Sequence, residues 1–331
     1  MKPKATLHFD TLLPETIFQT VTDQGWQPTG RLVPLNSYEN RVYEIGLEEA
    51  EPVVVKYYRP GRWSREQIIE EHRFVEAVAE AEIPVVLPLP LRKSLPGIAS
   101  LHEIHGIFYC FYPKFRGREH DEITNDDRRW LGRSLARLHN VGENFSLKHR
   151  LALNPRTYGE QSLEFILSQQ FLPADLKQNI EAHLLRAIEL ARPFFEGVKA
   201  IAVHGDCHPG NILWNRDGPH LLDFDDMVLA PPVQDLWMLF NGTEEEKREQ
   251  RKLFFEGYET FRRFDRGTLA LAEPLRTLRM IRHAAWIGQR YGEPAFRRAF
   301  PYYEERRYWE EFLLGIKEQI GLLLDFQPPD R

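Results

Sequence analysis

The stretch 204-HGDCHPGNILWNRDGPHLLDFDD-226 holds the densest group of polar, chemically active side chains in this sequence. Asp206 is followed five residues later by Asn211, and Asp223 comes near the end of 212–224, which reads as two short apolar strands around a turn. A hairpin brings the residue before its first strand close to the residues that end its second strand. We therefore expect Asn211 and Asp223 to lie near each other.

Two readings of this stretch as a metal site fit poorly. His204, Asp206, Cys207 and His208 are ligand types that suit zinc. Four ligands within five loop residues, however, rarely converge on one tetrahedron. A two-metal phosphoesterase would need ligands delivered from several separated strands, whereas here they crowd into one loop. Both readings are disfavoured on geometric grounds.

A phosphoryl-transfer site needs fewer protein ligands than either of these metal sites. It needs magnesium to neutralise phosphate charge, oxygen ligands for that ion, and a carboxylate that orients the attacking group. Asp206 and Asn211 match the catalytic loop D-x-x-x-x-N of kinases, and Asp223 matches the metal-binding aspartate that follows it. Asp225 stands where the more familiar motif has glycine. The pattern predicts a kinase-type catalytic loop.

The front of the chain carries a matching lysine. Lys56 ends the β-branched run 53-VVVK-56, the position of the lysine that meets the α and β phosphates in kinases. A helix predicted at 64–82 follows, and one of its glutamates should pair with that lysine. Glu70 and Glu71 both compete for this role. Glu71 is favoured, because the valines four and seven positions after it then face the core.

The glycine-rich phosphate loop of kinases is missing. The turn 35-LNSYEN-40, which joins two strands predicted within 31–47, contains no glycine. Backbone N–H groups and the hydroxyl of Ser37 can still reach phosphate oxygens from such a turn. We expect Ser37 to contact ATP.

The coarse organisation is α+β, with strands first and helices later. Besides 31–47, strands are predicted at 53–58 and 106–115, with a single helix among them. We place a boundary at Pro113, giving an N-lobe at 1–113 that binds nucleotide and a helical C-lobe at 114–331. The helices predicted for that second part are 125–142, 174–195, 244–261, 268–292 and 302–324.

Composition excludes some classes of partner. The formal net charge of −6 and a pI near 6.1 give no basic surface for nucleic acid or anionic membranes. Cys110 and Cys207, the two cysteines, have no metal-binding spacing and predict a reducing compartment. No signal-peptide core and no run of eighteen apolar residues is visible. We expect a cytoplasmic, monomeric protein with no membrane segment.

These motifs together resemble the aminoglycoside phosphotransferase and choline kinase-like superfamily, whose members have a bilobal fold like that of protein kinases. The resemblance rests on H-G-D-x-H-x-x-N at 204–211, D-F-D-D at 223–226 and D-L-W at 235–237. More narrowly, the chain is similar over nearly its whole length to the bacterial stress response kinase A group. The segments that carry this likeness are 35–45, 54–64, 70–74 and 204–214.

The resemblance implies an ATP- and magnesium-dependent serine/threonine protein kinase of the stress response. Its partner would be a protein with a serine or threonine hydroxyl, and autophosphorylation would make it a phosphoprotein. Asp206 would be the catalytic base, and Ser37 would contact ATP. Asn211 and Asp223 would bind magnesium, and Asp223 would also belong to the active site. Asp235 and His204 would hold the catalytic loop.

Alternatives stay open at this point. After Asp223 the segment 227–239 has no A-P-E motif and no room for a long activation loop, so peptide docking is not visible. A small-molecule kinase acting on an amino alcohol, a sugar or an aminoglycoside fits the same residues. A catalytically silent nucleotide-binding regulator is a third reading, which the intact Lys56, Asp206 and Asn211 disfavour.

Overall fold

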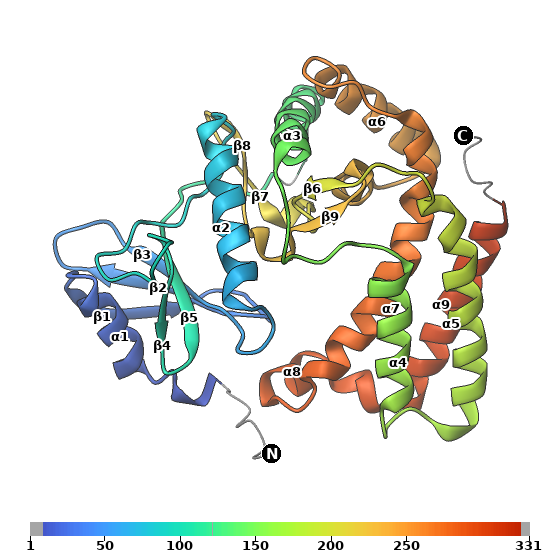
Figure 1. Ribbon diagram of the computed structural model, residues 1–331, viewed down its shortest axis with the longest axis horizontal. Coiled ribbons are helices and arrows are strands. Elements are labelled where there is room, and N and C mark those ends of the chain that lie inside the picture. Colours follow the sequence, from blue (N-terminus) through green and yellow to red (C-terminus); the bar gives the residue numbers. More distant parts are fainter. Residues whose placement is uncertain (1–8, 121, 326–331) are drawn as a thin grey trace.

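A five-stranded antiparallel sheet occupies the first part of the chain. The computed structural model describes residues 9–120 and 122–325 (Figure 1). Across the sheet the order is β1-β2-β3-β5-β4. In the register, Lys56 lies opposite Val42 on one side and Cys110 on the other, so it sits on the central strand. The strands are β1 (Pro28–Pro34), β2 (Arg41–Leu47), β3 (Val53–Tyr57), β4 (His102–Ile104) and β5 (Ile107–Pro113).

The strands expected from the sequence are confirmed, but the expectation of a single helix beside them was wrong. A further helix, α1 (Pro14–Asp23), precedes the sheet and packs Ile17 and Val21 into the sheet's core. The edge strand β4 was not predicted either. It pairs with β5 over only three residues, too few to leave a pattern in the sequence.

The predicted capped helix is α2 (Arg65–Glu80), and it packs on both parts of the molecule. Ser64 Oγ accepts the Gln67 N–H, and the Gln67 side chain accepts the Ser64 N–H, which confirms the capping box. Ile68 packs with residues of the sheet. Phe74 and Val78, farther along the helix, belong to the large core of the helical part. The division of the chain at Pro113 stays a prediction.

The second part is mostly helical (Figure 1). Two small antiparallel sheets interrupt it, one pairing β6 with β9 and one pairing β7 with β8. The five predicted helices are confirmed as α3, α5, α6, α7 and α9, whereas β6, β9, α4 and α8 were not predicted. The bounds are α3 (Asn125–Asn144), α4 (Gln161–Ser168), α5 (Ala174–Phe195), β6 (Ile201–Val203), β7 (Ile212–Asn215), β8 (Gly218–Leu221), β9 (Val228–Ala230), α6 (Glu244–Tyr258), α7 (Ala272–Arg290), α8 (Pro294–Ala299) and α9 (Arg306–Asp325).

The architecture is α+β and bilobal, with the five-stranded sheet in the N-lobe and most of the helices in the C-lobe, as expected. Figure 1 places the sheet with α1 on one side of the molecule and α4, α5, α7 and α9 on the other. The β7–β8 hairpin lies beside α2 and α3 between these two groups. Within the described ranges, no helix combines the length and the apolar character needed to cross a membrane.

Candidate active site

A buried carboxylate holds the loop that follows β6. Asp235 accepts hydrogen bonds from the backbone N–H groups of His204 (2.9 Å) and Gly205 (2.8 Å), and its Oδ2 lies 3.2 Å from His139 Nε2. His204 Nε2 lies 2.7 Å from the carbonyl oxygen of Leu222, on the far side of the hairpin. Asp235 and His204 thus have the loop-holding contacts that the resemblance implies for them.

Asp206 and Asn211 lie on this loop and are in direct contact. Asn211 Nδ2 donates to the backbone carbonyl of Asp206 at 3.0 Å. The backbone carbonyl of Asn211 accepts the Leu222 N–H at 3.0 Å, so the hairpin brings Asn211 next to the residue that precedes Asp223. Because the amide nitrogen of Asn211 is engaged, its side-chain oxygen is the atom left to face a metal ion.

Asp206 has two nitrogen-bearing side chains beside it. The guanidinium of Arg279, on α7, lies 2.7 Å from Asp206 Oδ1, and His208 Nε2 lies 3.6 Å from Oδ2. Burial alone would raise the pKa of Asp206, but the nearby His208 and the charge of Arg279 outweigh this effect and hold the pKa well below its usual value. The carboxylate is therefore ionised at neutral pH. Sequence reasoning missed Arg279, which no motif links to the loop.

Lys56 is buried at the centre of three carboxylates. Its Nζ lies 3.0 Å from Asp223, 3.4 Å from Asp225 and 3.6 Å from Glu71. Burial alone would lower the pKa of Lys56, but these three charges reverse the effect and raise the pKa well above its usual value. The ammonium is therefore charged and lies against Asp223, which is predicted to bind magnesium.

The two adjacent glutamates of α2 face different partners. Glu71 contacts Lys56 and also accepts hydrogen bonds from Arg150 (2.7 Å) and from the hydroxyl of Tyr58 (3.0 Å). Glu70 instead accepts hydrogen bonds from the backbone N–H groups of residues 148–150, with N···O distances of 2.6 to 2.9 Å. The structure thus pairs Glu71, and not Glu70, with the lysine.

Asp223 has the exposure and the chemistry that a magnesium ligand needs. Its backbone is left-handed, with φ of 54°, and its side chain is 52% exposed, so the carboxylate is open to a ligand. Asn211 adds a second oxygen donor, and hard oxygen donors are those magnesium prefers. In the described ranges no three His, Cys, Asp or Glu side chains are grouped so as to hold a metal ion. Asn211 and Asp223 would therefore share the ion with phosphate oxygens.

The turn at 35–40 docks on the C-lobe. Ser37 Oγ accepts the Asn40 N–H at 3.2 Å, and no hydrogen bond in the described residues joins Ser37 to Lys56. Asn40 Nδ2 donates to Asp225 at 3.1 Å, which ties the turn to the end of the hairpin. Ser37 thus lies in the turn where ATP binding is predicted, and its hydroxyl is engaged with the backbone of the same turn.

Arg62 is a further buried cation that sequence reasoning missed. Its guanidinium forms ion pairs with Asp225 and Asp226 and lies 3.7 Å from Glu39. Burial alone would lower its pKa, but these carboxylates raise the pKa well above its usual value. Asp225, where a glycine was expected from the motif, thus supplies negative charge shared by Lys56 and Arg62.

Comparison with known proteins shows which class of enzyme has this sequence and this fold. Residues 31–272 match the phosphotransferase enzyme family. Among solved structures, an amicoumacin kinase, described in complex with AMP-PNP, Ca²⁺ and amicoumacin, superposes with a TM-score of 0.72 at 20% identity over 92% of both chains. A microcompartment-associated aminopropanol kinase superposes with a TM-score of 0.65 at 19% identity, over 94% of this chain and 96% of its own. The protein is an ATP-dependent phosphotransferase with the aminoglycoside phosphotransferase and choline kinase-like fold.

More similar sequences narrow the family. Stress response kinase A of Escherichia coli strain K12 is 36% identical over 326 residues, covering 97% of this chain and 96% of that protein. The serine/threonine protein kinase RdoA of Salmonella typhimurium strain LT2 is 37% identical over 325 residues, with the same coverage. The chain belongs to the stress response kinase A family, also named RdoA.

Proposed function

We propose that this kinase transfers the γ-phosphate of ATP to a serine or threonine hydroxyl of a protein. Asp206 accepts a hydrogen bond from the acceptor hydroxyl and aims its oxygen in line at the γ-phosphorus. Lys56, oriented by Glu71, binds phosphate oxygens, and Ser37 contacts ATP from the turn. Asn211 and Asp223 hold magnesium, which when bound neutralises phosphate charge.

One observation carries this proposal. A buried lysine on the central strand lies within 3.0 Å of Asp223, and Asp223 follows a hairpin whose other end places Asn211 against Asp206. A lysine, a catalytic carboxylate and two oxygen donors for a metal ion are the groups that phosphoryl transfer needs, and here they come from elements far apart in the sequence. The serine/threonine acceptor rests on the relative named as a serine/threonine protein kinase.

The test is phosphate transfer by purified wild type and Asp206→Asn with γ-labelled ATP and magnesium. Acceptors are the enzyme alone, a generic protein substrate, and a panel of amino alcohols, sugars and aminoglycosides. We expect label on serine or threonine with wild type, and a loss of roughly 10²- to 10⁴-fold in rate with Asp206→Asn. Excess EDTA should abolish transfer.

Asp217→Asn is the matched control, because Asp217 is an exposed carboxylate in the turn of the same hairpin, away from the cluster. It should keep wild-type activity. Label that appears only on a small molecule would replace the protein-kinase proposal with the small-molecule alternative. Full activity in Asp206→Asn would remove Asp206 from its proposed role.

A further inference from the structure

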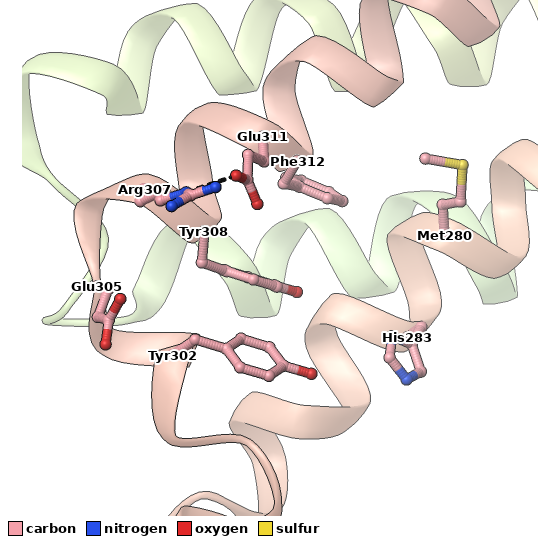
Figure 2. Close-up of a pocket in the computed structure, with 8 residues that line it drawn as sticks. All are labelled: Met280, His283, Tyr302, Glu305, Arg307, Tyr308, Glu311 and Phe312. Carbon is pink, nitrogen blue, oxygen red and sulfur yellow. Dashed lines mark hydrogen bonds and ion pairs between the residues drawn. The ribbon is translucent and has the colours of Figure 1, made fainter.

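A pocket of about 560 Å³ opens between α7 and α9 in the C-lobe (Figure 2). It lies outside the group of residues around Lys56 and Asp206, and the proposed mechanism does not use it. Aromatic and acidic side chains dominate its walls. The lining residues are Met280, His283, Tyr302, Glu305, Arg307, Tyr308, Glu311 and Phe312.

The aromatic wall is suited to a cation. In Figure 2 the rings of Tyr302, Tyr308 and Phe312 extend from α9 and the segment before it toward Met280 and His283 of α7. Tyr308 and Phe312 are nearly parallel, with ring centroids 6.3 Å apart, and Tyr302 lies 5.7 Å from Tyr308. Aromatic faces attract cations through the negative charge of their π systems.

The charges of the wall favour a cation as well. Glu305 and Glu311 contribute two carboxylates, and Arg307 is the one lining residue with a fixed positive charge. Burial and the nearby Arg279 lower the pKa of His283, so the imidazole is neutral at neutral pH. Arg307 pairs with Glu311 at 2.7 Å, but both side chains are well exposed, at 82% and 61%. Such a pair is weak, and a ligand cation can replace it.

Two residues of the pocket wall lie close along α7 to the arginine that contacts the proposed catalytic base. Met280 and His283 lie within about one helical turn of Arg279, whose guanidinium contacts Asp206. The rise from Arg279 to His283 is roughly 6 Å along the helix axis, and a long side chain spans about as much again. Roughly three to four residues of extended chain cover the combined distance of about 12 Å. A peptide whose hydroxyl sits at Asp206 could therefore reach the pocket with a nearby side chain.

Resting on the proposed protein-kinase function, we propose that this pocket binds the side chain of an arginine in the protein substrate, two to four residues from the acceptor hydroxyl. A guanidinium stacks flat on aromatic rings and can make paired hydrogen bonds to a carboxylate, which an ammonium cannot. The pocket therefore determines substrate specificity, while Asp206 and the residues around Lys56 perform the transfer.

The experiment uses the full chain with ATP, magnesium and peptides that carry one serine. In one set a single arginine is moved from four residues before the serine to four after it, and in the reference peptide a glutamine replaces it. We expect arginine at one of the positions two to four residues away to lower KM about tenfold with little change in kcat, the size of one desolvated cation–π contact. Fluorescence anisotropy of labelled peptides without ATP gives the matching Kd.

Glu305→Gln and Tyr302→Ala test the assignment to this pocket. Each should raise KM and Kd several-fold for the arginine peptide and leave the glutamine peptide unchanged. Glu310→Gln is the control, because Glu310 is exposed on α9 and pairs with Arg306 outside the pocket. Equal KM for all peptides, or an arginine preference that survives both pocket variants, overturns this inference alone. Absence of transfer to any peptide or protein by wild type overturns the proposed function as well.

Discussion

At the scale of single residues, Glu70 and Glu71 have unlike roles although they are neighbours on one helix. Side-chain spacing on α2 favours Glu71 as the partner of Lys56, and the structure places it there. The role of Glu70 could not be foreseen, because its partners are backbone N–H groups at 148–150, in a loop far along the chain. The spacing of side chains along a helix can be predicted from the sequence, whereas a contact with the backbone of a distant loop cannot.

Glu71→Gln and Glu70→Gln should therefore separate catalysis from stability. Glu71→Gln removes a charge that orients Lys56, so we expect kcat/KM for ATP to fall by up to about 10²-fold. Glu70→Gln weakens hydrogen bonds to a charged acceptor, so we expect a loss of about 2 kcal/mol in the free energy of unfolding with near-normal kcat/KM. Steady-state kinetics and urea unfolding of both variants check this. The reverse pattern would contradict the assignment of the ion pair.

His72 predicts a pH dependence of stability. Its Nε2 lies 2.9 Å from the hydroxyl of Tyr58 and its Nδ1 2.7 Å from Ser100 Oγ. Burial, together with the charges of Lys56 and Arg150, lowers its pKa to about 3. Between the unfolded pKa of about 6.5 and this value only the unfolded state binds the proton, so stability falls as pH falls through that window, by about 1.4 kcal/mol per pH unit.

Urea unfolding at about pH 7 and about pH 5.5 measures this effect. Wild type should lose about 1 kcal/mol more than His72→Gln between the two conditions, because the variant has no imidazole to protonate. Equal losses in the two proteins would mean that His72 titrates normally in the folded state.

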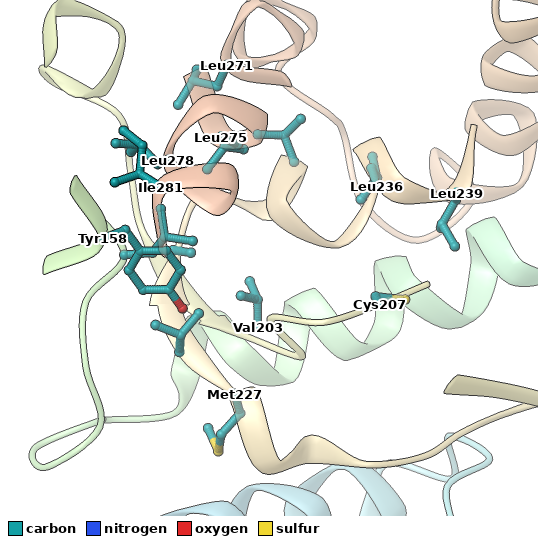
Figure 3. Close-up of a cluster of buried hydrophobic side chains, with 14 of the residues drawn as sticks. Tyr158, Val203, Cys207, Met227, Leu236, Leu239, Leu271, Leu275, Leu278 and Ile281 are labelled. Carbon is teal, nitrogen blue, oxygen red and sulfur yellow. The ribbon is translucent and has the colours of Figure 1, made fainter. Parts of the chain in front are cut away.

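At the scale of elements, α7 explains how Arg279 reaches Asp206. Leu275, Leu278 and Ile281 of this helix pack in one buried cluster with Val203 of β6 and with Cys207 of the catalytic loop (Figure 3). This packing fixes the helix beside the loop, and Arg279 then faces the carboxylate. The amphipathic pattern of 268–292 predicts the helix, but it does not say which loop the helix will touch.

The crossing of α3 and α6 depends on close backbone approach. A Cβ atom added to Gly257 would lie 1.9 Å from the carbonyl oxygen of Arg129, and one added to Gly132 would lie 2.1 Å from that of Phe254. Neither backbone oxygen can move without shifting its helix. Glycine at these two positions is what lets the helices meet.

We expect Gly257→Ala to lower the free energy of unfolding by about 3 kcal/mol and the Tm by roughly 5 °C or more. Gly321→Ala is the matched control, because Gly321 is an exposed glycine within α9 and an added Cβ there meets nothing within 4 Å. It should gain up to about 1 kcal/mol through helix propensity. Calorimetry of both variants makes the comparison, and a neutral Gly257→Ala would contradict the packing.

At the scale of the whole molecule, the lobes are joined by charges around Glu39. The carboxylate of this residue, in the turn at 35–40, lies 2.7 Å from Arg59 Nε. It also accepts hydrogen bonds from Arg290 Nε, at 3.0 Å, and from the indole N–H of Trp286. Burial alone would raise the pKa of Glu39, but the charges of Arg62, Arg290 and Arg59 outweigh it and lower the pKa. The contact is thus strongest above the unfolded pKa of about 4.3 and is lost as pH falls.

A double-mutant cycle on Glu39→Gln and Arg290→Gln measures this connection. Because the pair is largely buried and joins the two lobes, we expect a coupling energy of about 1–3 kcal/mol in urea unfolding. The exposed pair Arg307 and Glu311, within α9, should give about 0.5 kcal/mol or less in the same cycle. A coupling near zero for Glu39 would mean that the lobes do not meet there in solution.

The sequence alone determined the local parts of this kinase. The order of Asp206, Asn211 and Asp223 around a hairpin, the lysine ending a β-branched strand, and the capped helix after it are patterns of short range, because turns, strands and caps depend on neighbouring residues. Only the tertiary structure decided that Arg279 faces Asp206, that Arg62 and Asn40 meet Asp225, and that Glu39 joins the lobes. Those partners come from elements far apart in the chain, and the packing of buried side chains, which leaves no local pattern, determines where such elements meet.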